Sequence, residues 1–144
     1  TRGRYKLPIY VGKAVPPGGR KGGFGLGKNP GQVLYRRLVE HAESIEQATN
    51  LRLQDFGCRY LVVEDIWIPL GEQLLIEWFS PIWNKIVDGF GNHPPGGPRG
   101  KQKRSRWDTV HPGRPWANTL PPNPKTTEQV LIEVTAFLSG KTYG

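Results

Sequence analysis

The sequence has little cysteine, no methionine and no long apolar run. Its one cysteine is Cys58, which excludes an intramolecular disulfide framework and a metal site built from several thiolates. The best apolar run, residues 61–70, is interrupted by Glu64 and Asp65. A membrane-spanning helix needs roughly 18 or more apolar residues in succession. We therefore expect no membrane span, and no signal-peptide pattern is visible.

Hydrophobic residues are also scarce, whereas glycine and proline are abundant. Hydrophobic residues make up 36% of the 144 residues, which include 19 glycines and 14 prolines. A chain of this length corresponds to one domain and can bury about two thirds of its unfolded surface. We expect a single domain, residues 1–144, with a small packed core and long irregular loops. Loops of that length in a compact domain are usually functional.

Positive charge is concentrated at the two ends of the chain. Residues 1–37 hold nine Lys or Arg and no acid, residues 38–87 hold three bases and eight acids, and residues 88–144 hold eight bases and four acids. Basic loops on a chain of net charge +8 indicate a polyanionic partner, with nucleic acid as the leading candidate. A protein with merely solvated lysines is the alternative. An anionic membrane surface fits less well, because amphipathic basic helices bind such surfaces and residues 94–117 contain five prolines.

The hydrophobic pattern predicts a small α+β core. Alternation over residues 8–13 and the β-branched and aromatic run 58–63 predict strands, the second of them buried. Helical spacing of apolar residues predicts helices over three ranges: 32–49, 71–79 and 126–139. Thr126 and Gln129 have the spacing of a capping box at the start of the last helix. We expect a short antiparallel sheet flanked by helices.

Two inserted basic loops, residues 15–28 and 88–117, are predicted to bind DNA. Arginine outnumbers lysine in the second loop, and a planar guanidinium suits phosphates and guanine edges. His93, His111 and Asp108 lie here without the spacing of metal ligands, so we expect no zinc site. The DNA-binding candidates are Arg20, Lys21, Lys28, Arg99, Lys101, Lys103, Arg104, Arg106 and Arg114.

Several polar residues outside these loops are candidates for chemistry, each with an ordinary structural alternative. Arg37 and His41 stand one helical turn apart and share a face, which suits catalysis but also fits a surface pair. Glu72 falls in the first turn of the predicted helix 71–79, where the helix dipole favours a carboxylate. Asn84 alone would be a turn residue, and Tyr10 alone would be half-buried packing.

Taken together, these residues resemble the GIY-YIG nuclease superfamily. The stretch IYVGKA around Tyr10 resembles its YIG strand, and RRLVEHA with Arg37 and His41 resembles its catalytic helix. The pattern E-x-x-L-I-x-x-x-x-P-x-x-N, from Glu72 to Asn84, resembles its metal-binding helix. The stretch YVGKAVPPGGRKG and the arginine-rich region after Asn84 are similar to the type II restriction branch, in particular to an enzyme that cuts the palindrome CCGCGG.

The resemblance implies hydrolysis of DNA phosphodiesters with one divalent cation, Mg²⁺ or Mn²⁺, held by Glu72. Arg37 would bind the scissile phosphate, and Asn84 would position the Glu72 carboxylate or a metal-bound water. Tyr10 would act as or assist the general base, sharing this role with the first tyrosine of the family pattern, and nearby positive charge would have to lower its pKa. The implied catalytic residues are Tyr10, Lys13, Arg37, His41, Glu72 and Asn84.

The resemblance also implies features that this stretch of sequence does not display. The strand with the first tyrosine of the family pattern is expected upstream of Thr1, since Tyr5 is too close to Tyr10 to form a separate strand. A palindromic site implies a homodimer acting on double-stranded DNA in a prokaryotic cytoplasm, as part of restriction–modification. A homing or repair nuclease of the same superfamily, or a non-catalytic nucleic-acid-binding protein, remains the alternative.

Overall fold

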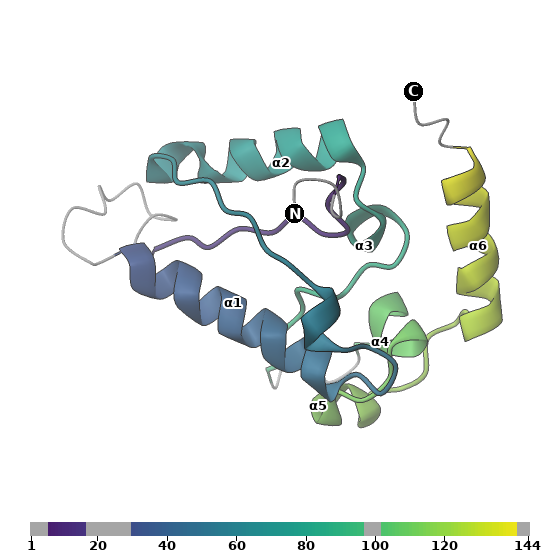
Figure 1. Ribbon diagram of the computed structural model, residues 1–144. Coiled ribbons are helices and arrows are strands. Elements are labelled where there is room, and N and C mark those ends of the chain that lie inside the picture. Colours follow the sequence, from purple (N-terminus) through teal and green to yellow (C-terminus); the bar gives the residue numbers. More distant parts are fainter. Residues whose placement is uncertain (1–5, 17–29, 97–101, 141–144) are drawn as a thin grey trace.

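The computed structural model describes residues 6–16, 30–96 and 102–140. Within them the chain forms α-helices and two 3₁₀ turns (Figure 1). None of the described helices is long and apolar enough to cross a bilayer. In chain order the elements are α1 (Pro30–Gln47), η2 (Leu53–Asp55), η3 (Asp65–Trp67), α2 (Ile68–Phe79), α3 (Ile82–Lys85), α4 (Arg106–Val110), α5 (Pro115–Asn118) and α6 (Thr127–Ser139).

The three long helices lie where the apolar periodicity predicts them. The capping box before α6 forms as expected, because the Thr126 hydroxyl accepts from the Gln129 amide while the Gln129 side chain accepts from the Thr126 amide. Helix α2 begins at Ile68, with a proline in its first turn, so Glu72 lies beyond the first turn in which it was predicted. Residues 88–117, predicted as irregular, contain the short helices α4 and most of α5.

The predicted antiparallel sheet is wrong, since the described residues contain no β-strand. A strand is held by backbone hydrogen bonds to a neighbouring strand, and residues 8–13 bond elsewhere. The Val11 amide donates to the Asn84 side chain at 2.8 Å, and the Asn84 side chain donates back to the Val11 carbonyl at 2.8 Å. The Ile9 carbonyl accepts from the Trp83 amide at 2.9 Å. Helix α3 therefore takes the place of a neighbouring strand.

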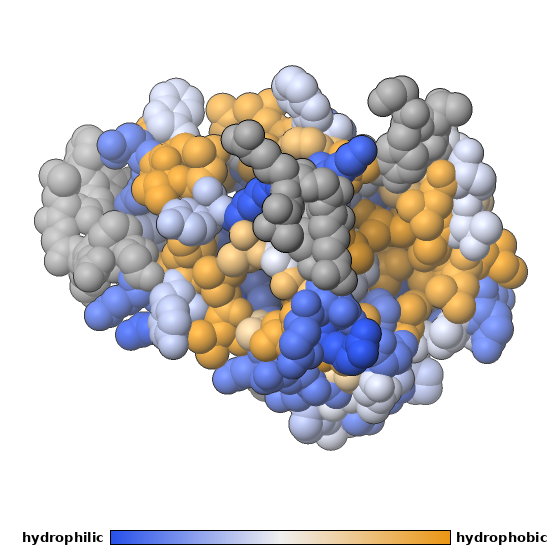
Figure 2. Space-filling model, in the orientation of Figure 1, coloured by the Kyte–Doolittle hydropathy of each residue, from blue (hydrophilic) through white to orange (hydrophobic). Residues whose placement is uncertain are grey.

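The segment predicted as a buried strand, residues 58–63, lies on the surface. Leu61 and Val62 are 72% and 73% exposed. Other exposed apolar side chains extend along α2 and α6, and Figure 2 shows apolar surface on both sides of this view of the molecule. The apolar side chains of the segment 58–63 thus contribute little to the core in this structure.

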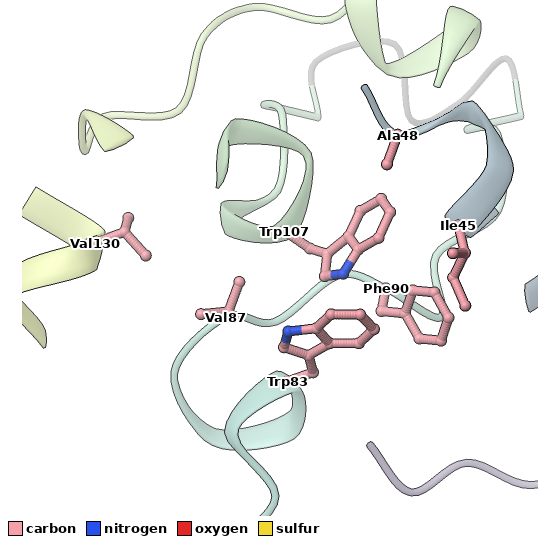
Figure 3. Packing of buried hydrophobic residues seen from close by; sticks show 7 residues of the cluster. All are labelled: Ile45, Ala48, Trp83, Val87, Phe90, Trp107 and Val130. Carbon is pink, nitrogen blue, oxygen red and sulfur yellow. The ribbon is translucent and has the colours of Figure 1, made fainter. Parts of the chain in front are cut away.

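The core is built around aromatic side chains from segments far apart in the sequence (Figure 3). The Trp83 and Trp107 rings meet edge to face with centroids 5.7 Å apart, and Phe90 packs on both. Aromatic side chains supply large buried areas for few residues, which suits a chain poor in hydrophobic residues. The buried cluster consists of Ile45, Ala48, Trp83, Val87, Phe90, Trp107 and Val130.

A buried ion pair lies against this core. The Arg114 guanidinium donates to both carboxylate oxygens of Asp108, at 2.6 and 2.7 Å. It also donates to the carbonyls of Gly89 and Phe90, at 2.9 and 3.0 Å, and Trp107 and Trp116 pack over its faces. Both side chains are almost fully buried. The pair therefore fixes the loop that follows Val87.

Replacing Asp108 by asparagine should lower the free energy of unfolding by about 3–5 kcal/mol, because it leaves the Arg114 charge buried without its partner. The measurement is urea unfolding of wild type and variant. Arg52→Ala is the control, since it removes an ion pair with Asp55 that is open to solvent and should cost at most about 1 kcal/mol. Similar losses in the two variants would contradict the structural role of the buried pair.

Candidate active site

The site is arranged around Tyr10, on the segment 6–16 that runs between α1 and α2 (Figure 1). The Tyr10 ring meets His41 of α1 edge on, with centroids 5.2 Å apart, and meets Phe90 at 4.9 Å. His41 stacks on Phe90 at 4.7 Å. Because Phe90 belongs to the core, both Tyr10 and His41 are held by packing.

Arg37 lies on the same face of α1, one turn before His41. Its Nη2 donates to the Gly91 carbonyl at 2.9 Å, and its Nη1 contacts Glu40 Oε2 at 2.8 Å and His93 Nε2 at 2.9 Å. The Glu40 side chain is 46% exposed, and an ion pair so open to water is weak. One side of the Arg37 guanidinium is therefore fixed by the Gly91 carbonyl, whereas its ion pair with Glu40 is weak.

Lys13 and Glu72 meet on the α2 side of the same segment. The Lys13 Nζ lies 2.5 Å from Glu72 Oε2. The Asn84 side chain makes no hydrogen bond to Glu72 within the described residues, and its other expected role, positioning a metal-bound water, stays a prediction. Both ends of its amide bind Val11, so Asn84 instead fixes the segment that carries Tyr10 and Lys13.

The surroundings of Glu72 fit a hydrated divalent cation. The described residues contain no group of three or more His, Cys, Asp or Glu side chains that could enclose a metal. Mg²⁺ commonly uses one or two carboxylates and keeps several waters, so a single carboxylate suffices. The ammonium of Lys13 on Glu72 shows that this carboxylate already holds a positive charge at that place.

Burial shifts the pKa values of Tyr10 and His41 in opposite directions. Burial raises the pKa of Tyr10 by more than the nearby Arg37 and Lys13 lower it. The nearby positive charges therefore do not bring the pKa of Tyr10 below its ordinary value in this structure, and its role as general base stays a prediction. Burial, followed by the charge of Arg37, lowers the pKa of His41 to about 4, so this imidazole is neutral at physiological pH.

The arginines and lysines predicted to bind DNA differ in their surroundings in the structure. Arg114 is buried on Asp108, which corrects its predicted contact with DNA. Arg104 donates to the Ala117 and Asn118 carbonyls, and Arg106 donates to the Ile86 carbonyl and Glu133. Lys103 is exposed. The candidates that lie outside the described residues are Arg20, Lys21, Lys28, Arg99 and Lys101.

Sequence reasoning missed Glu40, Gly91 and His93 as parts of the site. Gly91 leaves room at the centre of the site, because a Cβ on this residue would lie 2.4 Å from the Tyr10 hydroxyl and 2.9 Å from Arg37 Nη2. The loop that contains Gly91 and His93 has no hydrophobic periodicity from which its place in the site could be predicted. Its only sequence signal is a glycine on each side of Phe90.

Residues 1–138 match the family model described as the Eco29kI GIY-YIG domain. The match confirms the resemblance to GIY-YIG nucleases, so the protein is a nuclease and DNA is its substrate class. More narrowly, the chain belongs to the Eco29kI family of GIY-YIG restriction endonucleases. No curated protein matches the chain.

Replacing Gly91 by alanine should lower the DNA cleavage rate by about 100-fold, since displacement of reacting groups by about 1 Å has effects of that size. The new methyl group would displace the Tyr10 hydroxyl and the Arg37 guanidinium. Gly91 has no positive φ, so the substitution adds no backbone strain, and the unfolding midpoint measures what displacing the packed Tyr10 ring costs. Gly71→Ala is the matched control, because a Cβ there meets nothing within 4 Å. Full activity of Gly91→Ala would contradict this geometry.

Stability should fall as the pH is lowered from about 6.5 to 4. The unfolded His41 binds a proton near pKa 6.5, while the folded residue binds it only near pKa 4. The unfolded state therefore binds more protons within this window. Urea unfolding at several pH values should show a steeper loss for wild type than for His41→Gln. An NMR titration midpoint for the His41 ring near 6.5 would contradict the burial effect.

Proposed function

We propose that this nuclease is a Mg²⁺-dependent type II restriction endonuclease that cuts double-stranded DNA at a short GC-rich palindrome. The observation that supports the proposal is that Tyr10 lies near both Arg37, the candidate phosphate ligand, and Glu72, the candidate cation ligand. The charges of both Arg37 and Glu72 act on the Tyr10 hydroxyl, lowering and raising its pKa respectively. Membership in a restriction endonuclease family supports the same function.

Each polar residue of the site has a separate role in this proposal. Glu72 would hold the divalent cation, which when bound supplies charge neutralisation and an activated water. Arg37 binds the scissile phosphate and neutralises the charge that develops in the transition state. Once Lys13 is displaced from Glu72, its ammonium faces the phosphate. The protonated Tyr10 donates a hydrogen bond to the same phosphate. His41 and Asn84 hold Tyr10 and its segment in position.

Sequence recognition is assigned to the loops 15–28 and 88–117. Arginine forks on the O6 and N7 atoms of guanine are common base-specific contacts, and both loops contain arginine. A palindromic site is matched by a two-fold symmetric protein, so the proposal includes a homodimer with one active site for each strand. It also places the enzyme in the cytoplasm, as part of a restriction–modification system.

Glu72→Ala should abolish Mg²⁺-dependent cleavage of plasmid DNA while DNA binding persists, because the carboxylate that holds the cation is lost. Glu77→Ala is the matched control on the same helix α2, since it removes an exposed ion pair with Lys85 and should leave cleavage unchanged. Cleavage is measured on agarose gels, and binding by gel shift with Ca²⁺ in place of Mg²⁺. Retained cleavage by Glu72→Ala would overturn the assigned metal ligand.

The ends of the wild-type fragments distinguish the related functions. Discrete fragments with identical ends at a short palindrome support a restriction endonuclease. Nicking confined to branched or damaged DNA would favour a repair enzyme, and cutting at a long asymmetric site would favour a homing enzyme. Plasmid that stays intact with Mg²⁺ would favour a protein that only binds nucleic acid.

A further inference from the structure

Lys13 and Glu72 form an ion pair between two parts of the chain that are far apart in the sequence. Glu72 lies on α2, and Lys13 lies 59 residues earlier on the segment 6–16. The Lys13 Nζ is 2.5 Å from Glu72 Oε2. Two residues before Lys13, both ends of the Asn84 amide fix the Val11 backbone. An anchored segment therefore brings the ammonium to this carboxylate.

The pair is partly shielded from water. The Glu72 side chain is 19% exposed and that of Lys13 is 35% exposed, and a carboxylate with so little access to water is stabilised by a positive neighbour. Within the part of the chain that the structure describes, Glu72 pairs with no other base. A cation on the Glu72 carboxylate would meet the Lys13 charge at short distance, where like charges repel strongly.

A bound DNA phosphate supplies a second partner for the Lys13 ammonium. Arg37, the candidate phosphate ligand, and both members of the ion pair all affect the pKa of Tyr10, so their charges lie around one point. A phosphate on Arg37 thus brings negative charge close to Lys13. A lysine ammonium binds phosphate as a point charge on a flexible stem. Lys13 can therefore exchange a carboxylate for a phosphate without a change of fold.

We propose that Lys13 competes with the divalent cation for Glu72, and that DNA relieves this competition by drawing the ammonium onto a phosphate. The proposal rests on the nuclease function proposed above. Without DNA, binding of a cation breaks the ion pair and leaves Lys13 without a counter-charge. With DNA bound, the same exchange leaves both positive charges matched. Because coupling between two ligands is reciprocal, the cation strengthens DNA binding by the same factor.

The first test measures Mn²⁺ binding to the whole protein without DNA, by the electron paramagnetic resonance signal of the free ion. Lys13→Gln removes the ammonium and keeps a polar side chain. It should bind Mn²⁺ at least about fivefold more tightly than wild type, the lower end of typical coupling between sites. Lys85→Gln is the matched control, because it removes the same charge from an ion pair with Glu77 of α2. It should bind Mn²⁺ like wild type.

The second test measures the reciprocal effect, by gel shift of a plasmid fragment with and without Ca²⁺. Ca²⁺ should lower the dissociation constant of the DNA complex for wild type and for Lys85→Gln by the same factor. For Lys13→Gln this factor should be at least about fivefold smaller, because no ion pair has to be broken. Folding of the variants is checked by the unfolding midpoint.

The competition is refuted if Lys13→Gln binds Mn²⁺ no more tightly than wild type, or if Ca²⁺ strengthens its DNA binding as much as in wild type. Equal tightening in Lys85→Gln would also refute it, since net charge alone would then explain the effect. Glu72→Ala separates these failures from failure of the proposed function. Wild-type affinity of Glu72→Ala for Mn²⁺ would show that the cation binds elsewhere, whereas lost binding with an unchanged Lys13→Gln would refute the competition alone.

Discussion

The buried pair of Asp108 and Arg114 is the interaction on which the site depends. A buried guanidinium is tolerated only when its charge and its donors are matched, and here it binds one carboxylate and the carbonyls of the loop 89–92. That requirement fixes the backbone of the loop. The Gly91 carbonyl then holds Arg37 Nη2 at 2.9 Å. The buried ion pair of Asp108 and Arg114 thus helps to fix the orientation of the Arg37 guanidinium in the candidate site.

The charged residues of the candidate site have charged partners in the free protein. Lys13 covers Glu72 in the place proposed for a cation, and Glu40 covers Arg37 in the place proposed for a phosphate. Both pairs are partly open to solvent, and such pairs contribute little net stability. In the proposed function, binding of substrate and metal therefore exchanges one set of charge contacts for another. The site can stay ordered before binding without burying an unpaired charge.

Local sequence patterns predicted the helices correctly but did not predict the tertiary contacts. The periodicity of α1 and the capping box of α6 depend on residues close in the sequence, so both could be read directly. The sheet was predicted wrongly because Asn84, 73 residues from Val11, supplies the hydrogen bonds that a neighbouring strand would have given. The burial of Arg114 likewise depends on Asp108 and on distant carbonyls. Composition gave only the charge of this region.

Packing against the aromatic core fixes Tyr10 and His41 and also changes their chemistry. Phe90 contacts both rings, and the resulting loss of solvent disfavours a tyrosinate as well as an imidazolium. Precise placement and proton transfer near neutral pH therefore favour different environments. Both environments occur around Arg37, because Tyr10 and His41 are packed against the core while His93, which contacts the guanidinium, is exposed. A loop rich in glycine, attached to the core through Arg114, can present such a residue without burying it.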